Sequence, residues 1–164
     1  MIIREAKSGD LQELTEIYNY EVLNGVATLD YEPKSLADRK LWMEAHNTEN
    51  HPLYVAEADG KVAGYASLSS YREKEAYKTT VELSVYIGER YRRMGVATAL
   101  MEHILQEAKR RDDIYTVVSV ITAGNEASRR LHEKFGFVFC GTIKEVGMKH
   151  GRLLDIENYQ LLTR

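Results

Sequence analysis

The sequence is short of the residues and segments that cross-link or anchor a chain. Its single cysteine, Cys140, cannot form an internal disulfide, so we expect a reducing compartment. No apolar run approaches the roughly 20 residues that would span a membrane. The N-terminus becomes polar after three residues and has no signal-peptide core. We therefore expect a soluble, cytoplasmic protein with no membrane partner.

An excess of charge of one sign is also missing. The chain is 29% charged, but its formal net charge is only −3, which argues against a nucleic-acid partner. No His, Cys or Asp spacing indicates a metal site, and the patterns GxxxxGK[ST] and GxGxxG are absent. What is present is a 44% hydrophobic chain of 164 residues, which suits one globular domain over residues 1–164.

Hydrophobic periodicity predicts a mixed α/β domain in the order β-α-α-β-β-β-α-β-α-β-β. Ser8 is expected to cap the first helix, and Ser35 with Asp38 resembles a capping box before the second. The dipeptide Asp59-Gly60 predicts a hairpin turn. The expected elements are strand 1–6, helices 9–23 and 36–46, strands 53–58, 61–71 and 79–88, helix 93–111, strand 115–121, helix 126–136, and strands 137–145 and 153–162.

Two of these elements have more specific expectations. The segment 79–121 has the length of a strand–helix–strand unit, which favours a parallel crossover. Strand 115–121 is almost continuously apolar and is expected to be buried on both faces. The helix that follows it should end at Gly136, a natural position for a glycine with positive φ.

Residues 90–98, RYRRMGVAT, place arginines and a glycine where the long helix begins, although the helix dipole favours arginine at the other end. Free N–H groups in a first turn, with no Cβ on Gly95, can form an anion site. Arg92 and Arg93 would add charge suited to a pyrophosphate. A solvated arginine pair beside Glu89 and a packing glycine would explain the same residues. The residues alone leave both explanations open.

The same stretch carries a resemblance. RRMGVA after ELSVYIG resembles the pyrophosphate motif of the GNAT superfamily of acyl-CoA N-acyltransferases, and NEASRRLHEKFGF resembles its second signature. IYNYEV, EP, YR and KHGRLLDIENYQL are similar to the phosphinothricin acetyltransferase-like branch, whose members acetylate the α-amino group of phosphinothricin, methionine sulfoximine or methionine sulfone. The resemblance covers the whole chain. It implies the GNAT fold, acetyl-CoA as co-substrate, a small-molecule amine acceptor and a homodimer.

The resemblance also implies where acetyl-CoA binds. The pantetheine would pair with the backbone of strand 79–88, and the pyrophosphate would accept N–H groups at the start of the following helix. Asn125 would contact the pantetheine arm, although it is equally a candidate helix cap, and the two roles can coexist. The implied positions are Val85, Tyr86, Ile87, Arg93, Met94, Gly95, Val96, Ala97, Thr98 and Asn125.

Two residues are candidates for proton transfer. Taken alone, Glu82 is more simply a solvent-facing strand residue, because alternation places Val81, Leu83 and Val85 on the other face. The resemblance instead implies that Glu82 is the general base that accepts the amine proton. His132 stands where the wider superfamily usually has tyrosine. The resemblance implies that His132 gives a proton to the leaving thiolate, whereas the residue taken alone would indicate a surface histidine.

The acceptor site is the least specified part of the sequence. Arg72 precedes the Glu82 strand and is expected to bind the acceptor's carboxylate or oxidised head, the alternative being a solvated loop charge. Leu29 and Leu153 stand where the branch often has aromatic residues, which leaves the acceptor's identity open. Cys140 lies in an apolar strand and is expected to be buried rather than nucleophilic.

The expected function is transfer of an acetyl group from acetyl-CoA to the amino group of a small amino acid or analogue. The amine would attack directly, with Glu82 as general base and in contact with the acceptor. One alternative is acetylation of a peptide or protein N-terminus. The other is a non-catalytic acyl-CoA-binding module, against which the presence of Glu82 and His132 beside the cofactor motif argues.

Overall fold

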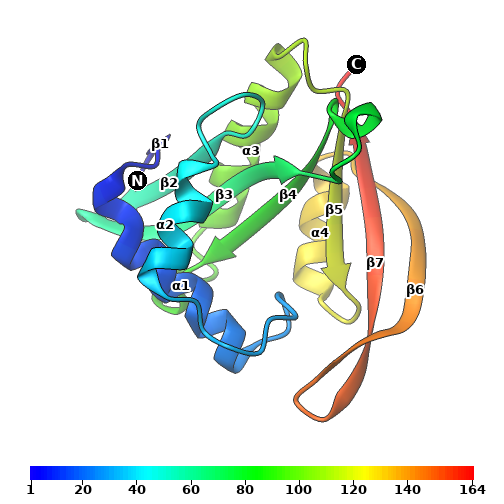
Figure 1. Cartoon of the computed structure of the whole chain (residues 1–164), viewed down its shortest axis with the longest axis horizontal. Coiled ribbons are helices and arrows are strands. Elements are labelled where there is room, and N and C mark those ends of the chain that lie inside the picture. The colour runs from blue at the N-terminus through cyan, green and yellow to red at the C-terminus, as the bar shows by residue number, and fades with distance from the viewer.

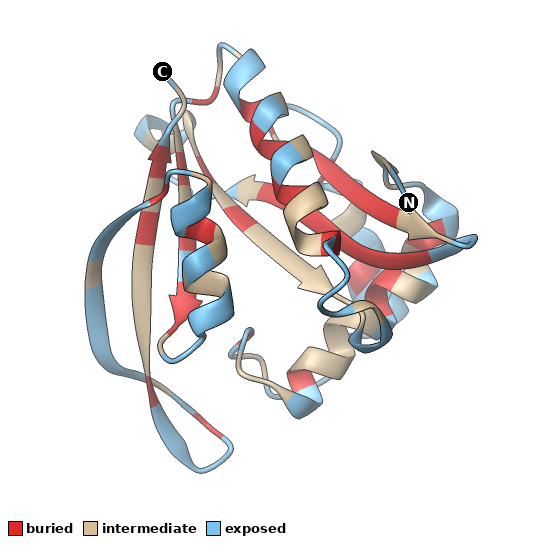
Figure 2. Cartoon of the chain, turned by 180° about the vertical axis from the view of Figure 1, so that it is seen from behind, coloured by how far each residue is buried: buried red, intermediate tan, exposed pale blue.

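The computed structural model describes all residues from 1 to 164 and contains one seven-stranded sheet in the order β1-β2-β3-β4-β5-β7-β6. Helices α1 and α2 cover one face of the sheet, and α3 and α4 cover the other (Figures 1 and 2). The predicted element order is confirmed. The elements are β1 Ile2–Glu5, α1 Leu11–Asn24, α2 Leu36–Glu44, β2 Leu53–Ala58, β3 Lys61–Ser70, β4 Thr80–Ile87, α3 Val96–Arg110, β5 Thr116–Thr122, α4 Glu126–Lys134, β6 Val138–Lys149 and β7 Arg152–Leu162.

The main core lies between the sheet and α3. Buried residues repeat along α3 at the i, i+4 spacing that the sequence shows, and they form the buried face visible in Figure 2. These residues are Val96, Leu100, Ile104 and Ala108. They belong to a cluster of 19 buried apolar residues, whereas a second cluster of five buried residues lies on the α1 side of the sheet. The most densely buried part of the molecule is therefore β2, β3 and β4 with α3.

The sheet divides at its centre. As predicted for 79–121, β4 and β5 are parallel neighbours, but they pair only from Thr80 to Glu82. Beyond Glu82, β4 continues against β3 to Ile87, while β5 continues against β7 to Thr122. The two strands diverge there, and each leaves backbone groups unpaired on the side facing the other.

Several local predictions are confirmed. Asp59 and Gly60 have φ of 52° and 76°, the left-handed pair that a two-residue hairpin turn requires. The Ser35 hydroxyl accepts the N–H of Asp38 at 3.1 Å and so caps α2. Gly136, with φ of 89°, follows the last turn of α4. None of the helices combines the length and the apolar character needed to cross a membrane.

The starts of two helices differ from the sequence prediction. Ser8 lies in a short 3-10 turn before α1 and its side chain caps no helix. The Asp10 carboxylate accepts the Lys7 N–H at 2.7 Å instead. Helix α3 begins at Val96 rather than at residue 93. Arg93 and Gly95 both have a positive φ, so the backbone there cannot belong to a right-handed helix.

The second half of the sheet is more exposed than predicted. Val120 in β5 is 38% exposed, so burial on both faces is wrong: α1 and α2 cover β2 to β4 but do not reach β5. Strands β6 and β7 extend through most of the expected 147–152 connection and turn at His150 and Gly151. Cys140 is exposed rather than buried, because β6 is the edge strand of the sheet.

Candidate active site

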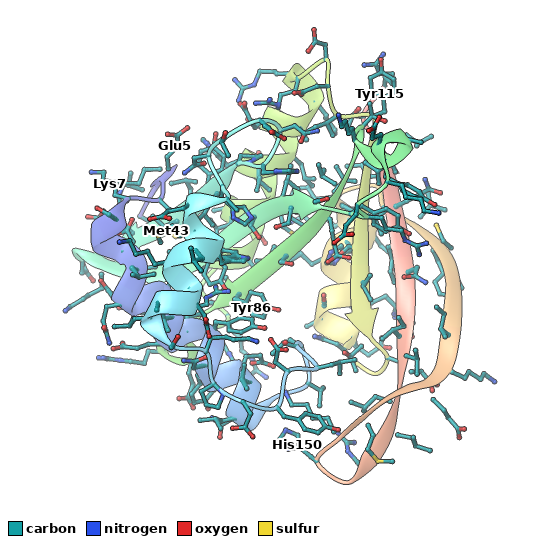
Figure 3. The ribbon with its side chains drawn as sticks, in the orientation of Figure 1. Glu5, Lys7, Met43, Tyr86, Tyr115 and His150 are labelled. Carbon is teal, nitrogen blue, oxygen red and sulfur yellow. The ribbon has the colours of Figure 1, made fainter.

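Two cavities meet at Glu82. The central groove, about 730 Å³, follows the diverging edges of β4 and β5 to the start of α3. The helix pocket, about 460 Å³, lies between the sheet and helices α1 and α2. Glu82, Ser84 and Tyr86 line both, and Figure 3 shows Tyr86 beside α2. Molecules bound in the two cavities would therefore meet beside the Glu82 carboxylate.

The edge of β4 offers hydrogen bonds to the central groove. The Gly88 N–H donates to the Ala63 carbonyl of β3 at 2.8 Å. Because every second residue of an antiparallel strand directs its backbone groups to the same neighbour, the N–H and C=O of Tyr86 also face β3. The N–H and C=O groups of Val85 and Ile87 face the groove, where β5 has diverged. Of the three expected backbone positions, the structure thus brings two to the groove. Tyr86 contributes its ring instead.

The loop before α3 presents consecutive free amides. The N–H groups from Arg93 to Thr98 donate to no carbonyl, and the first helical bond runs from Ala99 to Gly95 at 3.1 Å. Positive φ at Arg93 and Gly95 shapes such a turn into a concave anion site at the positive end of the helix dipole. No atom lies within 4 Å of where a Gly95 Cβ would be, so a ligand can approach the backbone. These residues fit a pyrophosphate.

The side chains around this loop are less uniform than the sequence indicates. Met94 is 65% exposed, so only its backbone belongs to the anion site. The Arg92 guanidinium lies 3.3 Å from the Glu21 carboxylate, which already provides part of its charge compensation. Asn125 is a helix cap, since its Oδ1 accepts the Ser128 N–H at 3.1 Å, and it also lines the central groove. Both of its expected roles are compatible with this geometry.

Glu82 lies at the position where β4 leaves β5. Its half-buried carboxylate forms no hydrogen bond and no ion pair with the protein, and burial raises its pKa. The solvent-facing interpretation is therefore wrong, because the side chain lies between the two cavities and opposite Ser69 of β3. An unpaired carboxylate with a raised pKa, at the contact of two cavities, can accept a proton from a bound group.

His132 is buried rather than on the surface. Its Nδ1 lies 2.7 Å from the Ser128 carbonyl and its Nε2 lies 2.7 Å from the Ser119 hydroxyl. Because a carbonyl can only accept, Nδ1 carries the proton and Nε2 accepts from Ser119. Burial lowers the pKa of the imidazole, which favours its neutral form. In this form Nε2 has no proton to give and instead orients the hydroxyl of Ser119, a residue that also lines the central groove and that sequence reasoning missed.

The expected acceptor residues lie apart from one another. Arg72 lines neither cavity; its guanidinium lies over the Tyr71 ring at 4.9 Å, within an exposed loop. Leu29 lines the central groove and packs on the backbone at Gly147. Leu153 is 52% exposed and lines neither cavity. The role of Arg72 in acceptor binding remains a prediction that its position does not support.

The helix pocket instead contains Arg39, which sequence reasoning missed. This residue of α2 is only 6% exposed, and its guanidinium lies 3.9 Å above the Trp42 ring. Its Nη2 donates to the Tyr65 hydroxyl at 2.9 Å. The three-residue spacing of Arg39 and Trp42 was a usable signal, because it places a cation and an aromatic ring on one helix face.

The loop between α1 and α2 closes one side of the central groove. Two side chains of the second half of the sheet donate hydrogen bonds to backbone carbonyls of this loop. Lys149 Nζ donates to the Thr28 carbonyl at 2.7 Å, and Thr122 Oγ1 donates to the Val26 carbonyl at 2.6 Å. The Tyr31 hydroxyl donates back to the Met148 carbonyl. These bonds hold the loop, including Leu29, beside the site where the two cavities meet.

An extended ligand with amide groups and a pyrophosphate tail fits the central groove, its reactive end beside Glu82 and its tail on the free amides. Acyl-CoA has this form, and the fold and groove together define an acyl-CoA-dependent transferase. A sequence model of the Acetyltransferase (GNAT) family matches residues 13–137, and the chain belongs to this family. It is an acetyl-CoA-dependent N-acetyltransferase.

Similar proteins have acceptors of two kinds in their names. The chain is 38% identical over 160 residues to an L-methionine sulfoximine/L-methionine sulfone acetyltransferase of Pseudomonas paraeruginosa, covering 97% of this chain and 92% of that protein. A structure of a Sinorhizobium meliloti phosphinothricin acetyltransferase in complex with acetyl-CoA has a TM-score of 0.94 at 34% identity, over 98% and 87% of the chains. A ribosomal-protein-alanine N-acetyltransferase structure from Brucella melitensis has a TM-score of 0.95 at 38% identity, over 99% of each chain.

Proposed function

We propose that this enzyme, acting as one domain over residues 1–164, acetylates the α-amino group of a small amino-acid analogue of the methionine sulfone, methionine sulfoximine or phosphinothricin type. The observation that carries the proposal is the position of Glu82 between a groove suited to acetyl-CoA and a separate polar pocket. A pocket of about 460 Å³ suits a molecule of amino-acid size. The names of the relatives support the same acceptor class.

The reaction needs two proton movements. A bound ammonium group gives one proton to Glu82, and the neutral nitrogen then forms a bond to the carbonyl carbon of the acetyl group. The carbon–sulfur bond breaks, and the thiolate takes up a proton as the nitrogen loses its second one. We assign this second transfer to the Ser119 hydroxyl, which gives its proton to the thiolate and takes up the proton of the nitrogen, while His132 Nε2 holds the hydroxyl in place. Glu82 returns its proton to water, which completes the balance.

Acetylation of a protein N-terminus is the second candidate. It is supported by the similarity to the Brucella melitensis structure named as a ribosomal-protein-alanine N-acetyltransferase. The two candidates differ in what the helix pocket must hold: a whole amino-acid analogue, or only the first residue of a longer chain. Acceptor size therefore separates them.

A panel of amines offered with acetyl-CoA should distinguish these functions. We expect thiol release with methionine sulfone, methionine sulfoximine or phosphinothricin, and little with ordinary protein amino acids. Release of free CoA is measured with a thiol reagent, and the acetylated product by mass spectrometry. Turnover of an alanine-starting ribosomal peptide with none of the sulfone would favour the second candidate. Acetyl-CoA binding without thiol release from any amine would indicate a binding module.

We also propose that two copies associate through β6. This edge strand has one open hydrogen-bonding side, and five of its apolar side chains are between 49% and 63% exposed. They are Val138, Phe139, Ile143, Val146 and Met148.

Sedimentation velocity should show a dimer for the natural chain and a monomer for Ile143→Asp, because a charge would then be buried in the contact. Leu41→Asp, on exposed α2, is the matched control and should leave the dimer intact. A natural chain that sediments as a monomer at micromolar concentration would remove this proposal.

A further inference from the structure

The helix pocket contains a buried cation that no acid neutralises. Arg39 forms no ion pair, and its Nε is buried with no hydrogen-bond partner. Three acids, Asp30, Asp38 and Glu82, line the same pocket, but none of them lies within ion-pairing distance of the Arg39 guanidinium, and Asp30 accepts the Tyr18 hydroxyl. A desolvated guanidinium without a carboxylate is costly, and such groups normally have a partner.

The protein compensates this charge only in part. The guanidinium lies 3.9 Å from the centre of the Trp42 ring and 4.3 Å from that of Tyr18, which favours a cation at this position. Nη2 donates to the Tyr65 hydroxyl, but neither Nε nor Nη1 donates to a protein atom. The Ser67 hydroxyl, in the same pocket, is also buried without a partner. Nε and the Ser67 hydroxyl are themselves covered by protein, so the donor left for a ligand in this pocket is Nη1, and an unused donor on a buried cation indicates a polar ligand.

The register of the sheet places this cation away from the reacting nitrogen. Glu82 lies opposite Ser69, whereas Tyr65, which holds Arg39, lies opposite Tyr86. Four residues of strand separate Glu82 from Tyr86, roughly 13 Å between their Cα atoms. A carboxylate on the carbon that carries the amine would stay close to Glu82, whereas the far end of an amino-acid side chain extends toward Arg39.

We propose that Arg39 binds the oxidised head of the acceptor side chain and so makes the enzyme selective for it. This inference rests on the proposed function. Sulfone, sulfoximine and phosphinate heads each present two acceptor atoms on a tetrahedral centre, and a guanidinium offers parallel donors to such a pair. The thioether of methionine offers no comparable acceptor. Binding methionine would leave Arg39 buried and unpaired, which is the arrangement that rejects an analogue most strongly.

The test is the ratio of kcat/KM for methionine sulfone to that for methionine. We expect a ratio of at least about 100 in the natural enzyme, since a site built for hydrogen bonds discriminates strongly against an analogue without them. Arg39→Met should reduce the ratio to within a few-fold of one. Arg39→Lys keeps the positive charge but not the two parallel donors, so it is a second, independent variant and should lose about tenfold in the ratio. Lys40→Met, an exposed cation on the same helix, is the matched control and should keep the ratio.

A second pair of substrates separates the head from the carboxylate. 3-(Methylsulfonyl)propylamine and 3-(methylthio)propylamine differ as the sulfone and methionine do, but both lack the carboxylate. The natural enzyme should still prefer the sulfonyl amine, and Arg39→Lys should weaken that preference. Equal use of both amines by the natural enzyme would assign Arg39 to the carboxylate and overturn the proposal.

The remaining outcomes are equally decisive. Unchanged ratios in folded Arg39→Met and Arg39→Lys, with a loss in Arg72→Ala, would restore the sequence-based assignment of Arg72. The acceptor subsite alone would then be wrong, while the proposed function would stand. If the natural enzyme acetylates none of the oxidised analogues, the proposed function fails and this inference falls with it. KM for acetyl-CoA should stay unchanged in all Arg39 variants, which confirms that the central groove is intact.

Discussion

Gly95→Asp is expected to abolish acetyl-CoA binding. The substituted carboxylate would point into the turn where six consecutive N–H groups are free, and it would both occupy that site and repel the phosphates. Competition for the same N–H groups and repulsion of the phosphates should together lower the affinity by at least about 1,000-fold, or roughly 4 kcal/mol. The space beside Gly95 is open, so a packing clash within the protein is not the cause.

Gly60→Asp is the matched control for this substitution. Gly60 also has a positive φ, of 76°, and nothing lies within 4 Å of its missing Cβ, but it belongs to the β2–β3 hairpin turn. Both variants therefore carry the same backbone strain and the same added charge. Isothermal titration calorimetry with acetyl-CoA should give the wild-type Kd for Gly60→Asp and no measurable heat of binding for Gly95→Asp. Near-natural affinity in a folded Gly95→Asp variant would remove the pyrophosphate site from this loop.

Glu82→Gln should lower kcat by roughly 10²–10⁴, the usual contribution of a general base, while the Kd for acetyl-CoA stays close to natural. The carboxylate has no partner in the protein, so an amide of the same shape breaks no existing ion pair. Steady-state kinetics between pH 6 and pH 9 measures the effect, with Glu73→Gln in the exposed 71–79 loop as control. Turnover within a few-fold of natural across that range would assign Glu82 a structural role only.

The same substitution should also stabilise the fold, in a pH-dependent way. Burial raises the folded-state pKa of Glu82 above its unfolded value. At a pH well below the unfolded-state pKa, Glu82 is protonated in both the folded and the unfolded chain, so the substitution should change the free energy of unfolding little through this group. As pH rises through the raised pKa, the ionised group is desolvated only in the folded state, so the natural chain loses stability relative to the variant. Urea unfolding at pH 4 and pH 8 should show the difference in free energy growing with pH.

Much of the fold follows from local pattern. The order of elements could be predicted because each strand and helix carries its own periodicity, and the α3 stripe from Val96 to Ala108 is buried as its spacing indicates. Turn positions with positive φ, such as Gly60 and Gly136, are also marked by residue type. Exposure of β5 could not be predicted, because it depends on which face α1 and α2 happen to leave uncovered.

The site was harder to predict where it depends on which way a side chain points rather than on where the residue stands in the sequence. The helix start and Glu82 are marked by residue type and spacing. Arg39 stands between two other charged residues, and its spacing to Trp42 indicates a shared helix face but not whether that face is buried. Taken without the family resemblance, His132 indicates a surface histidine, but the ring is buried against Ser119, Phe137 and Tyr159, which come from other elements. Such contacts exist only once the sheet and α4 have assembled.

The early divergence of β4 and β5 has a consequence for the lifetime of the enzyme. With only the residues from Thr80 to Glu82 paired to β5, the two parts of the sheet share a short seam, and a bound pantetheine would extend it along Val85 and Ile87. A ligand that binds only the folded chain stabilises it by mass action, by about 2.7 kcal/mol at a concentration of 100 times Kd. We therefore expect a high concentration of acetyl-CoA to make opening of the seam rarer and degradation of the chain by proteases slower. Metabolic scarcity would then lower the amount of enzyme as well as its rate.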